Sequence, residues 1–282
     1  MKYLVDNAGR PDLRRNEDST EATKHFIDLE AFGDSAAWKM PLSWDKAVSI
    51  YSKDSLLKYG YVPYHLLTMK NRLTDAFRSG NKDSILFYAA DMAHYIGDAN
   101  VPLHTSLNYD GQLTNQHGLH SLWESMIPEI EIEKYHLYSH HKASYLYDPA
   151  KTVWNCIRRS NKLLADVFSM EIEASKGFTD STKFRKQIRR GKEVKSYTSA
   201  FAKAYSKLLG HTINDQLLYS ASMIADFWYT CWVDAGKPAL SHLLVLPFEK
   251  KDKADCKEEL KAWRRNELIE KKILLSRNLV AQ

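Results

Sequence analysis

The chain is poor in cysteine, with only three residues of this type, at Cys156, Cys231 and Cys256. An odd number of widely spaced cysteines without a C-x-x-C pair predicts neither a disulfide framework nor a cysteine zinc site. The sequence also has no internal repeat and no low-complexity tract. Apolar residues make up 44% of the 282 residues, so we expect a hydrophobic core to stabilise the fold.

Long hydrophobic runs are lacking as well. The longest apolar stretch, 217–233, is interrupted by Asp226 and by hydroxyl residues, which indicates a buried amphipathic helix and no transmembrane segment. The first residues contain no apolar segment of the kind found in signal peptides. The net charge of +5 is small; it is compatible with an anionic substrate but does not require one.

The hydrophobic pattern predicts an all-α fold, a single multi-helix domain covering residues 1–282. Apolar residues recur at helical spacing, and Gly60, Gly80 and Pro102 lie where helices should end. Strand-like alternation is confined to short pieces such as 242–248. The expected helices cover 43–60, 62–80, 82–100, 117–127, about 150–175, about 195–235 and, as a charged C-terminal helix, about 252–280.

Metal-binding residue types are concentrated between residues 94 and 124. His94 and Asp98 are four residues apart on one expected helix, so both side chains project from the same face. Pro102 ends that helix and allows His104 to return toward the same point. His120 and Glu124 repeat the four-residue spacing on the next expected helix. This mixture of imidazole and carboxylate groups is typical of zinc sites.

Other metal-site patterns do not account for these residues. The sequence has no H-E-x-x-H motif, which excludes the zinc-protease helix, and no His-Asp dipeptide. One E-x-x-H occurs at Glu133–His136, whereas a di-iron helix bundle needs two such motifs on separate helices.

Three segments together resemble a known superfamily. "AHYIGDANVPLH", the later "HSLWE" and the earlier "KHFIDLE" resemble the pattern shared by zinc-dependent phospholipases C and single-strand-specific zinc nucleases. The similar portion runs from about 12 to 124, and the remainder is compatible in being helical. The resemblance implies the all-helical fold of that superfamily.

The resemblance also implies a set of zinc ligands. One ion would be bound by Asp12, His25, His94 and Asp98, and a second by His104, His120 and Glu124. Family spacing favours Asp12 over Asp6 as the first of these residues. His117 lies three residues before His120 and is an alternative ligand.

Asp12 and Arg15 are the residues that we expect to act in catalysis. Asp12 would be both a ligand and the base that orients the nucleophile, and Arg15 would face the scissile phosphate, as an arginine at that offset does in the nuclease branch. Asp91, three residues before His94, is a candidate acceptor for the second imidazole N–H of that histidine.

The expected chemistry is zinc-dependent hydrolysis of a phosphodiester. A hydroxide bridging two zinc ions would attack phosphorus in line, while the metals neutralise charge on the phosphate oxygens. The family binds a third zinc ion through an N-terminal tryptophan and a nearby histidine. Here no tryptophan precedes Trp38 and no histidine precedes His25. We therefore expect two zinc ions, as though the family's first segment and any export signal were missing, and the location stays uncertain.

The substrate branch is left open by the sequence. Glu124 as the last ligand favours a phospholipid substrate, whereas Arg15 and the Asn- and Gln-bearing loop at 105–116 favour single-stranded nucleic acid. The basic stretch 183–195 would suit either substrate, although such runs are usually solvated helix faces. The alternative is a helical zinc-binding scaffold without catalysis. No protein partner can be inferred.

Overall fold

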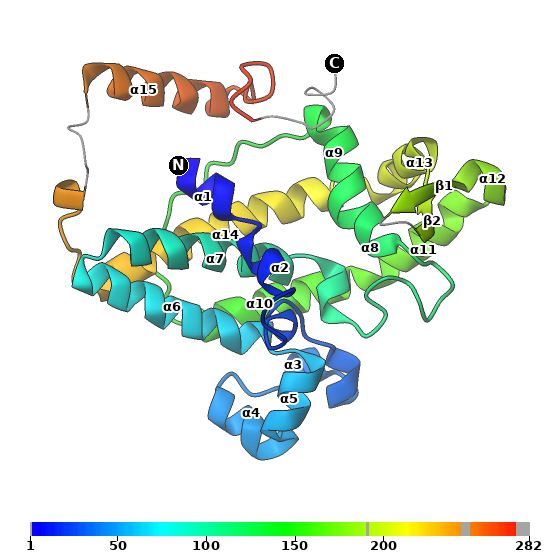
Figure 1. Ribbon diagram of the computed structural model, residues 1–282, viewed down its shortest axis with the longest axis horizontal. Coiled ribbons are helices and arrows are strands. Elements are labelled where there is room, and N and C mark those ends of the chain that lie inside the picture. Colours follow the sequence, from blue (N-terminus) through cyan, green and yellow to red (C-terminus); the bar gives the residue numbers. More distant parts are fainter. Residues whose placement is uncertain (1, 190–191, 244–248, 275–282) are drawn as a thin grey trace. The chain divides into compact units, whose positions relative to one another are not determined.

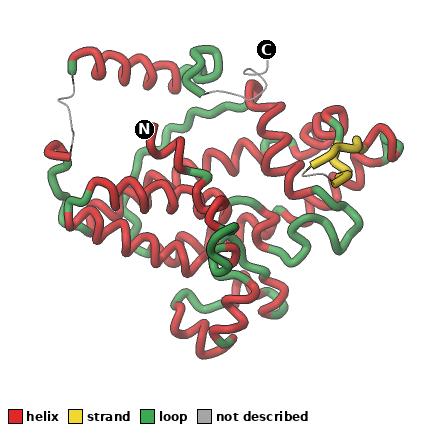
Figure 2. The backbone as a smooth tube through the Cα atoms, in the orientation of Figure 1, coloured by secondary structure: helices red, strands yellow, loops and turns green. Residues whose placement is uncertain are grey.

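The computed structural model describes residues 2–189, 192–243 and 249–274, and most of these residues are helical (Figure 2). The single sheet among them is an antiparallel pair, β1 (Phe184–Arg189) and β2 (Lys192–Tyr197). The prediction of a predominantly helical fold is therefore confirmed. Within the described residues no helix combines the length and apolarity needed to cross a membrane.

The chain divides into two compact units, each assembled from segments that are distant in sequence. The first unit contains residues 1–107, 140–162 and 219–248, and the second contains 108–139, 163–218 and 249–282. The helix α14 (Thr212–Asp234) contributes residues to both. The prediction of one domain over 1–282 stays a prediction.

The helices of the first unit enclose a core of aromatic and aliphatic side chains. Helices α6 and α7 pack side by side along most of their length, and α10 contacts both (Figure 1). The core between them includes Trp154, Tyr95, Leu66 and Phe227, each at most 1% exposed. The helices of this unit are α1 (Lys2–Asn7), α2 (Arg10–Arg14), α3 (Ala36–Lys39), α4 (Trp44–Tyr51), α5 (Lys53–Tyr59), α6 (Val62–Ser79), α7 (Lys82–Ala99) and α10 (Pro149–Lys162), with short 3₁₀ turns at Ala22–Lys24, Leu29–Phe32, Pro102–Thr105 and Ser241–Leu243.

The second unit combines short helices with the hairpin. Helix α13 packs against α11 and α9, and the hydroxyl group of the buried Tyr205 donates a 2.6 Å hydrogen bond to the backbone oxygen of Val167. Its elements are α8 (Leu119–Ser121), a π-helical turn (Leu122–Met126), α9 (Ile127–Glu131), a 3₁₀ turn (Ile132–Lys134), α11 (Leu164–Ser175), α12 (Asp180–Lys183), β1, β2, α13 (Ser199–Leu209) and α15 (Lys250–Arg264).

The helix ends predicted at Gly80 and before Pro102 are confirmed, but several longer ranges are interrupted. The range 43–60 is broken at Ser52, whose φ of 65° lies outside the helical region. The range 195–235 begins with strand and is broken at Gly210, where φ is 58°. The range 117–127 is continued past Pro128, which lies in the first turn of α9 directly after the π-helical turn.

The basic stretch 183–195 forms most of the hairpin and is not a helix face. Lys183 is held inside the second unit, because its Nζ lies 2.7 Å from Glu171 Oε1 and 5.2 Å from the centre of the Phe201 ring. Lys183, which the charge pattern predicted to be solvated, therefore neutralises the buried carboxylate of Glu171.

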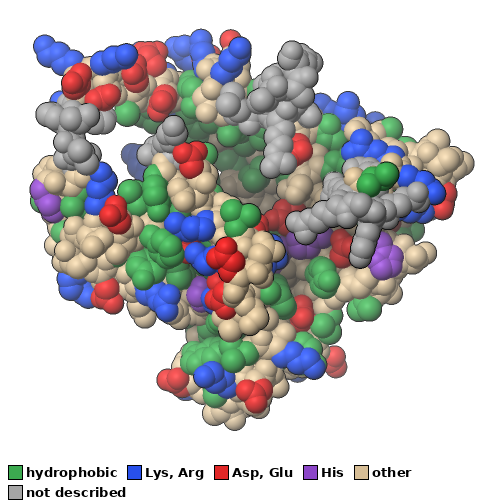
Figure 3. Space-filling model, viewed as in Figure 1, with side chains coloured by type: hydrophobic (Ala, Val, Ile, Leu, Met, Phe, Trp, Pro, Cys, Tyr) green, Lys and Arg blue, Asp and Glu red, His purple; other side chains and the backbone are tan. Residues whose placement is uncertain are grey.

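The charged C-terminal helix, predicted over about 252–280, ends at Arg264, and residues beyond 274 lie outside the described part (Figure 3 shows basic and acidic side chains along α15). Asn266 adopts φ of 58°, and its amide accepts from Leu137 N at 2.6 Å and donates to Tyr135 O at 2.9 Å. This side chain fixes the left-handed residue that follows the helix. The strand-like piece 242–248 lies, apart from its first two residues, outside the described residues.

Candidate metal centre

Helix α7 presents two of the predicted ligands from one face. His94 and Asp98 are one turn apart, and His94 Nε2 lies 3.3 Å from Asp98 Oδ2. The helix begins at Asn81, whose side chain accepts a hydrogen bond from Ser84 N. Asp98 is only 4% exposed, so its carboxylate needs a cation or several donors nearby.

His25 reaches the same point through backbone pairing with the segment that follows α7. Ile27 N donates to the backbone oxygen of His104 at 2.9 Å, and His104 Nδ1 donates to the backbone oxygen of His25 at 2.7 Å. His25 Nδ1 then lies 2.8 Å from Asp98 Oδ2. Two segments nearly eighty residues apart are thereby fixed against each other beside the metal-binding face of α7.

Asp12 is held against α7 by its neighbours on α2. Arg14 donates to Asp91 Oδ2 at 2.7 Å, and Arg10 Nε donates to Asp91 Oδ1 at 3.1 Å. The Arg10 guanidinium also lies 3.8 Å from the centre of the Phe87 ring, a favourable cation–π distance. Asp91 thus ties α2 to α7 instead of accepting from His94, the role that the sequence suggested.

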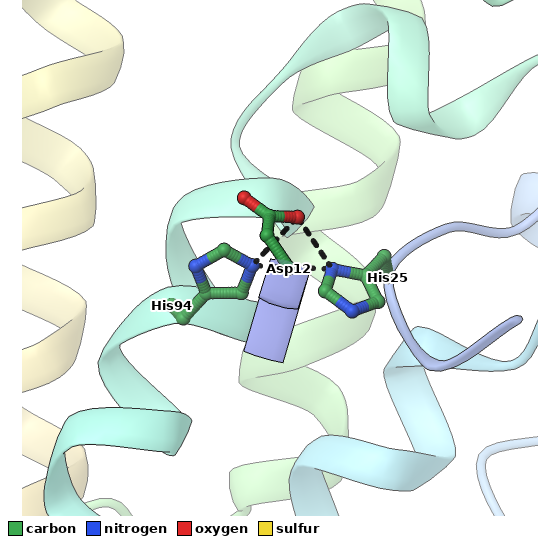
Figure 4. A group of neighbouring side chains, drawn as sticks. All are labelled: Asp12, His25 and His94. Atoms are coloured by element: carbon green, nitrogen blue, oxygen red, sulfur yellow. Dashed lines mark hydrogen bonds and ion pairs between the residues drawn. The ribbon is translucent and has the colours of Figure 1, made fainter. Parts of the chain in front are cut away.

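Asp12, His25 and His94 form a group in which the ligand atoms lie within 4.8 Å of one another (Figure 4), and Asp98 lies beside the two histidines. Asp12 Oδ1 lies 3.6 Å from His94 Nε2 and 3.8 Å from His25 Nδ1, while the two imidazole nitrogens are 3.1 Å apart. Asp98 completes the group at 2.8 Å from His25 and 3.3 Å from His94. We call Asp12, His25, His94 and Asp98 the four-ligand cluster.

These separations fit a metal ion. At zinc–ligand distances of about 2.0–2.2 Å, the ligand atoms of a tetrahedral site are roughly 3.3–3.5 Å apart. The measured separations, from 2.8 to 3.8 Å, fall on both sides of that value. Facing imidazole nitrogens beside two carboxylate oxygens also form a set that attracts a cation. Asp12, His25 and His94 can therefore hold a metal ion, and Asp98 lies next to the two histidines.

The contacts within the cluster shift the pKa values of Asp12 and His94. Burial alone would raise the pKa of Asp12, but the hydrogen bond and charge of His94, with Arg15 and His25, lower that pKa to about 2. Burial alone would lower the pKa of His94, yet the hydrogen bond to Asp12 and the charge of Asp98 raise that pKa. The contact between Asp12 and His94 therefore shifts the two pKa values in opposite directions.

A supporting residue that the sequence reading missed is Glu21. Its Oε1 lies 3.6 Å from the buried His25 Nε2, which has no hydrogen-bond partner among the described residues. Glu21 also accepts from Tyr95 and, at 3.2 Å, from Arg14. The four-residue spacing from Glu21 to His25 was visible in the sequence, and it repeats the spacing that identified His94 and Asp98.

His104 is oriented for ligation within the first unit. Because its Nδ1 donates to the backbone oxygen of His25, its Nε2 carries the lone pair in the neutral ring. That nitrogen lies 4.0 Å from Asp98 Oδ1, the carboxylate oxygen that does not face His94. Asp98 therefore faces the four-ligand cluster with one oxygen and His104 with the other.

His120 and Glu124 belong to the second unit. His120 Nε2 lies 2.6 Å from Glu124 Oε2, and His120 Nδ1 lies 3.1 Å from the backbone oxygen of Tyr109. Asp110 accepts from the backbone N–H groups of Gly118 and His120 and so caps the turn that carries them. His117 is exposed. That His104 shares an ion with His120 and Glu124 stays a prediction.

Arg15 pairs with Asp12 Oδ1, the oxygen that also faces the two histidines. The side chains of both residues are almost half exposed, at 44% and 46%, whereas His25 is buried. The cluster therefore has a buried side formed by His25 and Asp98 and an accessible side formed by Asp12 and Arg15.

Comparison of the chain with family models, with curated proteins and with solved structures finds no match in any of the three. The resemblance to zinc phospholipases C and zinc nucleases thus rests on the motifs alone.

Gly60 lies against the segment that carries His25, and a side chain at this position should destabilise the fold. Gly60 has φ of +86°, and a Cβ there would lie 2.3 Å from the backbone oxygen of Phe26, the neighbour of His25. Gly60→Ala should lower the free energy of unfolding by more than about 3 kcal/mol, because steric overlap adds to left-handed strain of about 1–3 kcal/mol.

Gly33→Ala is the matched control for this prediction, since Gly33 has φ of +99° but nothing within 4 Å of its Cβ position. Urea denaturation should show a smaller loss for Gly33→Ala. Equal losses for the two variants would contradict the proposed contact with Phe26.

Proposed function

We propose that the chain is a zinc-dependent phosphodiester hydrolase of the phospholipase C and zinc nuclease type. The observation that carries the proposal is the group of Asp12 Oδ1, His25 Nδ1 and His94 Nε2, which lie within 3.8 Å of one another, with Asp98 Oδ2 at 2.8 Å from His25 and 3.3 Å from His94. The cluster contains the residues that the sequence motifs assign to the first zinc ion.

The ligand types favour zinc over magnesium or calcium. Two imidazole nitrogens and two carboxylate oxygens suit zinc, whereas magnesium and calcium prefer oxygen ligands alone. Asp98 has one oxygen beside His25 and the other 4.0 Å from His104 Nε2, so it would be a ligand for zinc at this point. The two predicted ligand sets give an expected content of two zinc ions.

The roles of the chain's own residues follow from their placement. Zinc, when bound, would lower the pKa of a coordinated water to near 7 and neutralise charge on a phosphate. Arg15 presents a planar guanidinium on the accessible side, a group that binds phosphate oxygens in pairs. Asp12, also on this side, is placed to ligate the metal and to accept a hydrogen bond from an attacking water. His25 and Asp98 hold the buried side.

Hydrolysis of bis-p-nitrophenyl phosphate tests this function. We expect release of p-nitrophenolate by the zinc-loaded chain, its loss with a chelator, and its recovery on adding zinc. Phosphatidylcholine and single-stranded DNA assayed in parallel would distinguish the two substrate branches. If none of the three substrates is cleaved by the zinc-loaded chain, the hydrolase proposal fails.

A non-catalytic metal-binding scaffold is the second candidate, and one observation favours it. The cluster offers four protein ligands, and a closed four-coordinate shell is typical of structural zinc sites. A scaffold would bind zinc tightly and gain thermal stability from it without cleaving any of the three substrates. The same assays, with a metal-binding measurement beside them, separate the two functions.

A further inference from the structure

A pocket in the first unit lies next to Tyr95, whose ring also contacts one of the metal ligands. The Tyr95 ring makes an edge contact with His25 at 5.2 Å and another with His65 at 4.6 Å. His65 is not one of the predicted ligands, and it lines a pocket of about 320 Å³ between α4, α5 and α6. That volume is near the lower end for small-molecule sites.

One wall of the pocket is aromatic. Trp44 and Tyr61 line it together, with their ring centres 5.5 Å apart and tilted by 52°. Both side chains are only partly buried, so ring surface remains for a ligand. Aromatic side chains of this kind stack on planar rings, and the stacking depends little on which ring is bound.

The pocket also carries positive charge. Lys24, Lys53 and Arg72 line it, and Lys24 is neutralised by Glu21 at 2.6 Å and by Asp18 at 3.5 Å. Lys53 and Arg72 have no ion-pair partner among the described residues. Two exposed cations at the rim of an aromatic pocket suit an anionic group such as phosphate.

A buried histidine also lines the pocket. His65 is only 7% exposed, and its Nε2 has no hydrogen-bond partner among the described residues. Burial, with the nearby charge of Lys24, lowers the pKa of His65 to about 3, so the ring is neutral at pH 7. His65 therefore adds no charge to the pocket, and its enclosed Nε2 is not open to a ligand.

We propose that this pocket binds a small aromatic phosphate monoester of the size of a nucleoside monophosphate. The phosphate would lie at Lys53 and Arg72, and the planar ring would rest against Trp44 and Tyr61. The site is separate from the four-ligand cluster and does not rest on the proposed hydrolysis.

Calorimetric titration of the full chain with adenosine 5′-monophosphate, in EDTA to exclude metal-bound phosphate, tests the proposal. Adenosine, ribose 5-phosphate and inorganic phosphate are the partial ligands. We expect each to bind at least about tenfold more weakly than the whole nucleotide, because each lacks the stacking or the charge contact.

Substitutions locate the site. Arg72→Ala and Lys53→Ala should each weaken nucleotide binding about three- to tenfold. Arg78→Ala is the matched control, since Arg78 lies on the same helix but pairs with Asp75 outside the pocket. Trp44→Ala removes part of the aromatic wall, so it should weaken the nucleotide but not ribose 5-phosphate, with thermal melting as the check on folding.

Three results would overturn the proposal: no nucleotide binding, inorganic phosphate binding as tightly as the nucleotide, or Arg78→Ala causing the same loss as Arg72→Ala. Because Arg72 and Lys53 are exposed, replacing either with alanine leaves no cavity in the core. The assay contains no metal, so failure of the hydrolase proposal would leave its outcome unchanged.

Discussion

His25→Ala should weaken zinc binding by the chain by more than about 100-fold. His25 Nδ1 lies within 3.8 Å of all three other ligand atoms, at 2.8 Å from Asp98, 3.1 Å from His94 and 3.8 Å from Asp12. Loss of an outer partner of a ligand already costs about 10- to 100-fold in affinity, and loss of the ligand itself should cost more. Competition with a chromogenic chelator gives the dissociation constant.

His211→Ala is the control for this variant, because His211 is exposed and belongs to neither predicted ligand set. It should bind zinc as the parent chain does. If His25→Ala also retained parental affinity, the four-ligand cluster would not be the zinc site. Circular dichroism of the metal-free proteins would show whether loss of fold contributes to any difference.

His104→Ala should reduce hydrolysis of bis-p-nitrophenyl phosphate by more than about 100-fold and lower the zinc content from about two ions toward one. His104 Nε2 is oriented by the bond from its Nδ1 to the backbone oxygen of His25 and lies 4.0 Å from Asp98 Oδ1. The variant removes the nitrogen assigned to the second ion and leaves the four-ligand cluster intact.

The alanine variant also leaves the backbone oxygen of His25 without its donor, at a cost of about 1–3 kcal/mol. His104→Asn separates the two effects, since its amide can donate from nearly the position of Nδ1 but cannot reach the position of Nε2. We expect the asparagine variant to be more stable than the alanine variant and equally inactive. Parental turnover in either variant would show that His104 takes no part in hydrolysis.

The local half of the candidate site could be predicted from the sequence. A four-residue spacing on a helix determines that two side chains share a face, and His94 and Asp98 do so in α7. The end of that helix before Pro102 followed from proline's effect on the preceding residue. These features depend on neighbours within one or two turns, which is the range that sequence periodicity describes.

The long-range half required the tertiary structure. That His25 lies beside His94 depends on backbone bonds between residues 25–27 and His104, and no spacing rule contains them. Asp12 was placed by family spacing alone, and the reason that it lies near His94 is the pairing of Arg10 and Arg14 with Asp91. Such ion pairs join segments that are about eighty residues apart in sequence.

The predicted helix boundaries were wrong where a single residue has backbone angles outside the helical region. Ser52 and Gly210 have positive φ and divide ranges that read as continuous from apolar periodicity. The basic stretch 183–195 was misread because its charge pattern suits a solvated helix, whereas Lys183 pairs with the buried Glu171 and lies over aromatic rings in the second unit. Charge pattern alone does not distinguish a solvated cation from one that neutralises a buried acid.

The most direct test of the metal centre is anomalous diffraction at the zinc absorption edge from crystals of the zinc-equilibrated chain. We expect an anomalous-difference peak about 2.0–2.2 Å from Asp12 Oδ1, His25 Nδ1, His94 Nε2 and Asp98 Oδ2. A zinc-equilibrated crystal with no peak among these four atoms, or with zinc bound only elsewhere on the chain, would contradict it.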